Sequence, residues 1–422
     1  MPMPKTISRL KWLSGLLFGI LFLIAISFAF NLENAIQKHV IAKKLEAQHH
    51  GMDILKDPGI RVIFAGTGVP VPSKDRGAQC IAVIANGELL IFDDGGAGVR
   101  SLAAWGYPIH KINKVFLTHL HSDHMAGLGG LIGATWIAGR TGPLRVYGPD
   151  DSNKLSHTLY PPTSQEYQTG TFTTGRVPDN RRVFELGKPD FPKAPKDYVP
   201  GIDYVLRGIS MAYEPDVMER NGNVQTRESA PWEMGFAIPH PLPDMESAGT
   251  APDFGWGELK TVYESESGKL KVKAFLVDHY ACFPSYGYRI ECGGQAVVIS
   301  GDTEKMTYMA KCAKGADILI HEAVNMRMLE AIAAVLEEKY GDHEKAGHYR
   351  GASAHHTDSL DVARTAMEAG VSRLVLTHVI PPIDPGFIHE RIFVKGMDDI
   401  FRGEIDVARD GMEIYLPPAA SE

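Results

Sequence analysis

The feature of the sequence that most clearly suggests chemistry is a short histidine-rich run after the apolar, strand-like stretch 115–117. Its candidate ligands are His119, His121, Asp123 and His124. Imidazoles with a carboxylate are a ligand set that zinc takes, and two such clusters can hold two ions that share one hydroxide, a nucleophile available at neutral pH. A surface loop that is merely rich in histidine is the alternative, and the buried-strand pattern before the run argues against it.

Further polar residues stand where other predicted strands end. The motifs are Val277-Asp278-His279, Gly301-Asp302-Thr303, His321-Glu322-Ala323 and Leu376-Thr377-His378. Each motif alone is weak, because a single histidine after a strand is usually a core residue. Enzymes built from alternating strands and helices assemble their sites from such strand ends, so the four motifs together predict one site.

In these motifs the chain resembles the metallo-β-lactamase superfamily, and within it the ribonuclease Z and arylsulfatase-like branch. The resemblance covers about residues 60–415 and also includes Gly66-Thr67-Gly68, Phe92-Asp93-Asp94-Gly95 and His355-His356-Thr357. It implies an α/β fold, a four-layer αββα sandwich with metals at the rim between two sheets. The alternation of strands and helices along the chain fits such an arrangement.

The resemblance also implies a ligand set. One zinc ion would be held by His119, His121 and His279, and the other by Asp123, His124 and His378, with Asp302 bridging the two ions. An aspartate between two cations is what a two-metal hydrolytic site requires. Two Zn²⁺ are therefore the expected cofactors, with Mn²⁺ and Fe²⁺ as alternatives because His and Asp ligands accept them.

The expected mechanism is attack by the shared hydroxide on a phosphorus, sulfur or acyl centre, with Asp123 orienting the nucleophile. His355 is the candidate for protonating the leaving oxygen because the spacing H-x-T selects it, and Glu322 is expected to fix its tautomer. The adjacent His356 competes for this role, since the sequence does not reveal which ring points inward.

Composition limits the size of the hydrophobic core and the classes of binding partner. The chain has 422 residues, of which 44% are hydrophobic, enough for one large or two modest cores. The formal net charge of -8, with no basic stripe, disfavours a nucleic acid partner. The four cysteines stand apart without C-x-x-C spacing, so they predict buried thiols rather than a zinc knuckle.

The N-terminus predicts a membrane segment. A basic cluster precedes residues 12–30, which carry no charge. Those 19 residues would form a helix of roughly 28 Å, close to the thickness of a bilayer core. We therefore expect residues 1–31 to be an anchor or a signal peptide, with the body facing the periplasm or the extracellular side, or secreted after cleavage.

Three further segments complete the expected organisation. Residues 32–58 have the spacing of a stalk helix, and residues 59–418 form the hydrolase domain. Within that domain, residues 149–257 are a loop-rich insert, rich in proline and aromatic residues, that predicts a lid or substrate wall.

The expected substrate is a small ester, either a sulfate ester or a phosphodiester. Ribonuclease Z proteins continue the last histidine motif with a phosphate-binding segment, whereas this chain has Pro381 and Pro382, which offer no N–H to a phosphate. A ribonuclease Z-like endonuclease that processes tRNA 3′ ends is the alternative, and a lactone or acyl substrate is a third. An anchored binding protein with little catalysis is the alternative of another class. The sequence leaves the oligomeric state open, a homodimer included.

Overall fold

The computed structural model describes residues 27–28, 31–32, 34–43, 52–149, 201–223, 237–242, 257–279 and 282–419. The chain divides into two units, Met1–Asp53 and Ile54–Glu422. In the first unit, residues 34–43 are helical and mostly exposed. The second unit contains both β-sheets.

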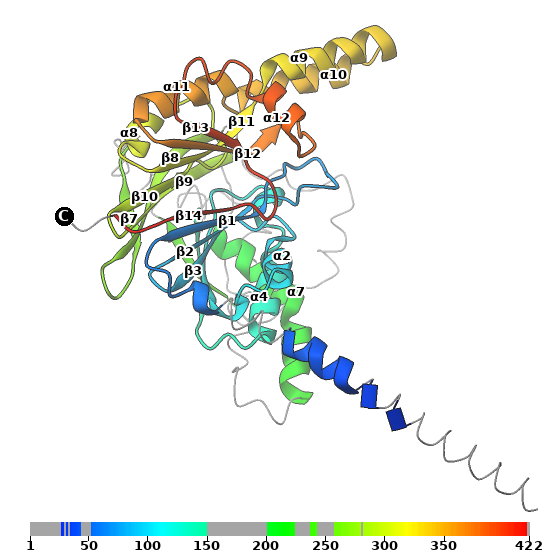
Figure 1. Cartoon of the computed structure of the whole chain (residues 1–422). Coiled ribbons are helices and arrows are strands. Elements are labelled where there is room, and N and C mark those ends of the chain that lie inside the picture. Colours follow the sequence, from blue (N-terminus) through cyan, green and yellow to red (C-terminus); the bar gives the residue numbers. More distant parts are fainter. Residues whose placement is uncertain are drawn as a thin grey trace, which may run out of the picture. The chain divides into compact units, whose positions relative to one another are not determined.

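Two mixed sheets form the centre of this unit (Figure 1). The first has the order β14-β1-β2-β3-β4-β5-β6 in the described part of the chain. Its strands are β1 Ile60–Gly66, β2 Cys80–Ala85, β3 Glu88–Phe92, β4 Ile112–Phe116, β5 Leu144–Pro149, β6 Ala237–Leu242 and β14 Glu413–Leu416. The turn between β2 and β3 has Asn86 at φ 51° and Gly87 at φ 78°, which confirms the hairpin expected from Asn-Gly.

The second sheet has the order β13-β12-β11-β10-β9-β8-β7, again for the described residues. Its strands are β7 Lys260–Glu264, β8 Leu270–His279, β9 Cys282–Cys292, β10 Gln295–Ile299, β11 Ile318–Val324, β12 Arg373–Ile380 and β13 Glu404–Val407. Strands β10 to β13 run parallel to one another, so their carboxyl ends meet at one edge. This edge carries the polar motifs of the second half.

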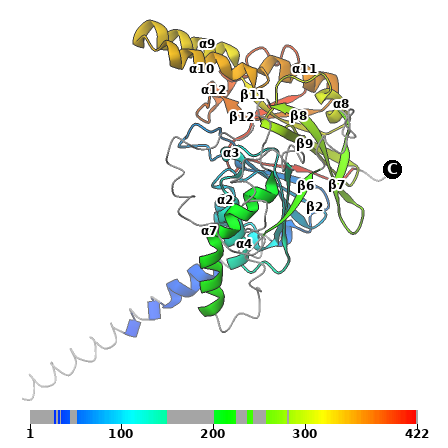
Figure 2. The same ribbon diagram turned by 180° about the vertical axis from the view of Figure 1, so that it is seen from behind.

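Helices cover the outer face of each sheet, as the two opposite views agree (Figures 1 and 2). On the first sheet they are α2 Gly98–Ala104, η1 Ile109–Lys111, α3 Ser122–Met125, α4 Leu128–Ile137 and α7 Ile202–Asn223. On the second they are α8 Met309–Ala313, α11 Ser359–Ala369 and α12 Phe387–Phe393. The helices α9 Met326–Val335, η6 Leu336–Tyr340 and α10 His343–Gly351 pack on one another and extend beyond this sheet in both views, and η7 Ala352–Ala354 follows them. The layers are those of the predicted sandwich.

Aromatic side chains fill the interface between the sheets. Phe92 stacks on Phe116 with ring centroids 5.1 Å apart, and Phe116 stacks on Tyr147 at 4.7 Å. Tyr288 from the second sheet meets Phe92 and Phe116 edge to face. Burial of large aromatic rings contributes strongly to stability, so this cluster fixes the sheets against each other directly beneath the ligand loop.

Some elements differ from expectation. Residues 237–242 lie within the segment expected to be loop-rich, yet they add strand β6 to the edge of the first sheet. Residues 343–351 form the helix α10 although their sequence is charged and contains two glycines. The remainder of the insert, at 150–200, 224–236 and 243–256, lies outside the described residues, so its role as a lid stays a prediction.

The anchor expected over residues 1–31 lies almost entirely outside the described residues. Within the part of the chain that the structure describes, no helix is both long and apolar enough to cross a membrane. The membrane-anchor helix of the predicted fold therefore receives no support.

Candidate metal centre

The ligand loop begins where β4 ends, and it is fixed from across the sandwich. The backbone N–H of Tyr286 donates to the carbonyl of Thr118 at 2.8 Å, and the Tyr288 hydroxyl donates to the carbonyl of Leu117 at 2.5 Å. Both donors belong to β9 of the second sheet. The loop is therefore clamped immediately before His119.

Asp93, directly after β3, orients the loop from beneath. Its carboxylate accepts hydrogen bonds from the Thr118 N–H at 2.8 Å, the Thr118 hydroxyl at 2.9 Å and the Nδ1 of His124 at 2.9 Å. The backbone reaches this position through a φ of 57°, rare for a residue with a side chain. Because Nδ1 of His124 is engaged, its Nε2 faces the centre.

Close backbone packing holds the turn after Asp93 against α3. A Cβ added to Gly95 would lie 1.7 Å from the carbonyl oxygen of Asp123. Only glycine fits at this approach. Asp93 thus ends the segment after β3 and orients the neighbouring Thr118 and His124 through its hydrogen bonds.

Each candidate ligand from the second sheet is positioned by a different local feature of the structure. His279 ends β8, and its Nδ1 donates to the carbonyl of His355 at 2.9 Å. In the neutral ring, Nε2 then has a lone pair that can bind a metal ion. Asp302 follows Gly301, whose φ is 64° and whose added Cβ would lie 2.5 Å from the Tyr286 carbonyl oxygen. His378 is the extra residue of a β-bulge between β11 and β12, with a φ of 46°.

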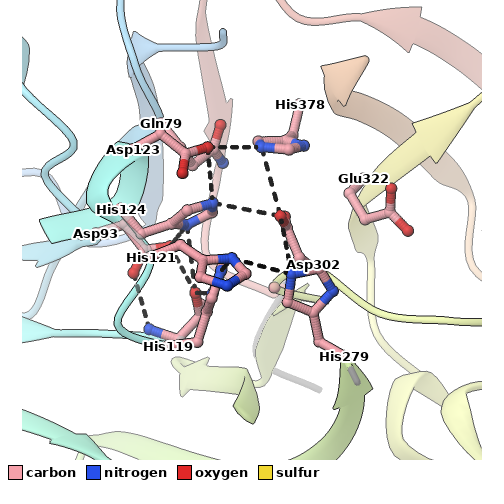
Figure 3. Close-up of polar contacts among 12 residues, drawn as sticks. Gln79, Asp93, His119, His121, Asp123, His124, His279, Asp302, Glu322 and His378 are labelled. Carbon is pink, nitrogen blue, oxygen red and sulfur yellow. Dashed lines mark hydrogen bonds and ion pairs between the residues drawn. The ribbon is translucent and has the colours of Figure 1, made fainter. Parts of the chain in front are cut away.

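The structure brings all seven predicted ligands together (Figure 3). In one group, Nδ1 of His121 lies 3.0 Å from Nε2 of His119 and 3.2 Å from Nε2 of His279. In the other, Nε2 of His378 lies 3.1 Å from Oδ2 of Asp123. Ligand atoms within each of these groups are within 4.8 Å of one another.

Asp302 lies between the two groups. Its Oδ2 is 3.4 Å from Nε2 of His124, 3.4 Å from Nε2 of His378 and 3.9 Å from Nε2 of His279. The side chain is almost fully buried. A carboxylate in this place can contact a cation in either group.

The first group has the chemistry of a cation site. Burial, together with the neighbouring His124, holds the pKa of His119 well below its usual range, and burial also lowers the pKa of His121 and His279. Each neutral imidazole offers one nitrogen lone pair, and these nitrogens lie only 3.0–3.2 Å apart. The group therefore has the ligand atoms that one divalent ion needs.

The second group has an excess of negative charge. Burial opposes ionisation of Asp123, but hydrogen bonds to His124 and His378 hold its pKa well below the usual value. Burial likewise opposes protonation of His124, yet the charges of Asp302 and Asp93 raise its pKa well above normal. The buried Nε2 of His124 lies between two carboxylates, 3.5 Å from Oδ2 of Asp123 and 3.4 Å from Oδ2 of Asp302. This group therefore favours a positive charge, and the residues fit a second cation.

Glu322 pairs with His356 and not with His355, so the predicted partnership is wrong. Oε2 of Glu322 accepts from Nδ1 of His356 at 3.1 Å, and Oε1 accepts from the Thr357 N–H at 2.7 Å. The ring of His356 lies 5.6 Å from that of His378 and 5.2 Å from that of His279. The main-chain carbonyl of His355 accepts the hydrogen bond from His279. The half-buried ring of His355 lies 6.3 Å from the ring of His279, farther than the ring of His356 does.

Gln79 is a neighbour that the sequence did not indicate. Its buried side chain accepts a hydrogen bond from the Thr377 hydroxyl at 3.0 Å, next to His378. It lies beside Asp123 in Figure 3. A lone glutamine before a strand has no ligand spacing, so no signal in the sequence could have found it.

Comparison with known proteins adds the family. Residues 74–191 match the model of the metallo-beta-lactamase superfamily. The chain carries a metallo-β-lactamase superfamily domain. Ribonuclease Z of Myxococcus xanthus is 26% identical over 361 residues, which cover 85% of this chain and 98% of that protein. Ribonuclease Z of Methanosarcina mazei is 27% identical over 364 residues, with the same coverage.

Among solved structures, human tRNase Z, short form, matches this chain with a TM-score of 0.48 and 21% identity, covering 85% of this chain and all of that one.

Two expectations about partners and place need correction. Nucleic acid was disfavoured on net charge, but relatives that align over nearly their full length are named as ribonucleases. Net charge is a poor guide here because bound cations at the candidate site would supply local positive charge that the amino-acid count omits. The expected membrane attachment and outward-facing location also need correction, because the relatives that align over nearly their full length are named ribonuclease Z.

Proposed function

We propose that this chain is a two-metal phosphodiesterase that cleaves RNA, with the 3′ ends of precursor tRNA as its substrate. The observation that carries the proposal is the convergence of two ligand groups on Asp302, with the Glu322–His356 pair beside them. Relatives named ribonuclease Z, aligned over 98% of their length, support RNA as the substrate class. The sulfate ester expected from the sequence has no counterpart among these relatives.

We assign the two cations, proposed as zinc, to the predicted ligands. One would be held by His119, His121 and His279, the other by Asp123, His124 and His378, and Asp302 would contact both. Bound divalent ions supply Lewis acidity toward a phosphoryl oxygen and a water-derived nucleophile at neutral pH. Asp123, ionised and beside this centre, would accept a hydrogen bond from the nucleophile and orient it.

His356 is the proposed general acid. Burial alone would lower its pKa, but the charge and hydrogen bond of Glu322 raise the pKa of His356 to about 9. The ring therefore holds a proton at neutral pH and could pass it to the oxygen that leaves phosphorus. Glu322 positions the ring by engaging Nδ1, which turns Nε2 away from the carboxylate.

The test is direct cleavage. The purified chain, with its metal quantified, is incubated with a precursor tRNA carrying a 3′ extension, with an aryl phosphodiester and with an aryl sulfate. We expect one discrete cleavage of the RNA and turnover of the phosphodiester. The variant His378→Ala should lose both activities, whereas His343→Ala should keep them, because that side chain is 78% exposed on α10.

The outcomes separate the substrate classes. Turnover of the aryl sulfate without cleavage of either phosphodiester would overturn the proposal. Turnover of the aryl phosphodiester without cleavage of the RNA would keep the reaction type and overturn the substrate.

A further inference from the structure

Arg76 is a buried cation that no part of the proposed chemistry uses. It lies in the loop between β1 and β2 and is only 4% exposed. Its Nε donates to the carbonyl of Ile383 at 2.9 Å, and its Nη1 donates to the Thr67 hydroxyl at 2.9 Å and the Ala408 carbonyl at 2.6 Å. One guanidinium therefore joins three segments that are distant in the sequence.

Two of these segments surround the strand end that carries His378. The N–H of Ala408 donates to the carbonyl of Leu376 at 2.7 Å, so Arg76 holds the segment that pairs with β12 just before His378. Ile383 lies five residues after His378, so the Nε hydrogen bond holds the chain on the other side.

The loop that carries Arg76 is itself fixed by Asp410. One carboxylate oxygen accepts from the Thr67 N–H at 3.0 Å and from its hydroxyl at 2.7 Å, and the other accepts from the Gly77 N–H at 2.6 Å. The same loop ends at Gln79, which bonds Thr377. The guanidinium thus reaches β12 from a rigid support.

His378 needs such support. It occupies a bulge with a φ of 46°, a conformation that persists in a residue with a side chain only when its surroundings impose it. If the chain around His378 relaxed, its ring would turn away from Asp123 and Asp302. The ligands His119 and His121 lie on another loop and would keep their positions.

We propose that Arg76 is a positioning residue for His378 and thereby sets the affinity of one metal site, the site formed by Asp123, His124 and His378, more than that of the other. This inference rests on the proposed metal centre. It concerns binding of the ion and holds whichever ester is cleaved.

The test is Arg76→Lys, which keeps the positive charge but cannot donate to Ile383 and Ala408 together. Metal binding is measured by titrating metal-free protein with Zn²⁺ against a chromophoric chelator, alongside thermal unfolding. We expect the Zn²⁺ affinity of one site to fall at least tenfold, the usual scale for loss of a supporting partner. The Zn²⁺ affinity of the other site should stay within a factor of about three of the wild-type value.

Arg140→Lys is the matched control. Arg140 is also buried, with Nε donating to the Thr135 hydroxyl at 3.1 Å and Nη1 donating to the Gly142 carbonyl at 2.7 Å, at the end of α4. It should lower the unfolding temperature and leave both metal affinities unchanged. A purely structural role for Arg76 would give this same pattern and would overturn the inference.

Double variants identify the weakened site. Added to His378→Ala, Arg76→Lys should have no further effect on metal affinity, whereas added to His279→Ala it should weaken the remaining site as well. Additive losses in both backgrounds would overturn the assignment.

Asp410→Asn provides a second route if Arg76→Lys fails to fold, because the amide places a donor against the Thr67 or Gly77 N–H. We expect a smaller loss at the same site, and wild-type affinity at both sites would overturn the inference. Wild-type protein that binds no divalent ion would instead overturn the metal centre itself.

Discussion

The two halves of the metal centre are built in different ways. The first sheet supplies His119, His121, Asp123 and His124 from one turn of six residues. The second sheet supplies His279, Asp302 and His378 from three separate strand ends. A contiguous loop needs one clamp, here Asp93 with β9. Dispersed ligands each need a backbone device, here a strand-end irregularity, a left-handed glycine and a bulge.

Formation of the site is therefore more sensitive to substitutions in the second half than to substitutions in the first. A change in the shared clamp of the first half shifts four ligands slightly. A change at one strand end of the second half removes one ligand completely. Substitutions in each half test whether their effects on metal binding differ in this way.

The largest effect is expected for Asp302→Ala, since this carboxylate lies between both groups. Losing one partner of a buried charge cluster costs roughly 3–5 kcal/mol, which is on the order of a thousandfold in metal affinity. Metal content after dialysis and turnover of an aryl phosphodiester should fall together. Asp278→Asn is the control, because Asp278 precedes His279 outside the cluster. Retention of two ions by Asp302→Ala would contradict the bridging position.

The next effect separates the two adjacent histidines. His356→Ala should slow turnover by about a hundredfold or more, the usual scale of general acid catalysis, and leave both ions bound. His355→Ala should keep turnover near that of the wild type, because His279 bonds the main-chain carbonyl of residue 355, which alanine retains. Steady-state kinetics with metal analysis measure both. The reverse ranking would restore the role first expected for His355.

A moderate effect is expected for the clamp of the first half. Asp93→Asn places an amide donor against the hydrogen-bond donors of Thr118 and His124, so the His124 ring loses its orientation. Loss of such a supporting partner typically costs 10–100-fold in metal affinity. Asp317→Asn, where the acid bonds the Ala296 N–H on the second sheet, should leave affinity unchanged. Equal losses in both variants would show general loosening.

The smallest effect concerns stability. Burial, with a contribution from neighbouring Asp93, raises the pKa of Asp94 from 3.8 to about 6. The folded protein therefore binds this proton more tightly than the unfolded chain does. The contribution of protonated Asp94 to the free energy of unfolding is complete below about pH 4 and is lost as the pH rises through about 6. The loss is up to about 3 kcal/mol.

Asp94→Asn should remove this slope. Urea unfolding of metal-free protein between pH 4 and 7 measures this slope. As the pH rises, the free energy of unfolding of the variant should increase relative to that of the wild type. Parallel curves for the two proteins would mean that Asp94 does not titrate in this range.

Much of the fold could be predicted because its signals are local. The Asn86–Gly87 hairpin and the strand patterns of β8 to β12 follow from periodicity and turn chemistry. Strand β6 could not be predicted, since its sequence Ala237–Leu242 contains two prolines and forms a strand only because β5 offers an edge to pair with. The helix α10 likewise carries little local signal, because its sequence is charged and glycine-rich.

The sequence by itself determined which residue types follow the strands and hence the class of chemistry, and its resemblance to a known family supplied the set of seven candidate ligands. Only the tertiary structure decided which ring faces Glu322, because His355 and His356 are chemically identical and differ only in direction. It also decided that a buried arginine from the first half holds the strand end of the second. Such contacts join residues whose spacing carries no pattern, since they form only after two distant segments have packed together.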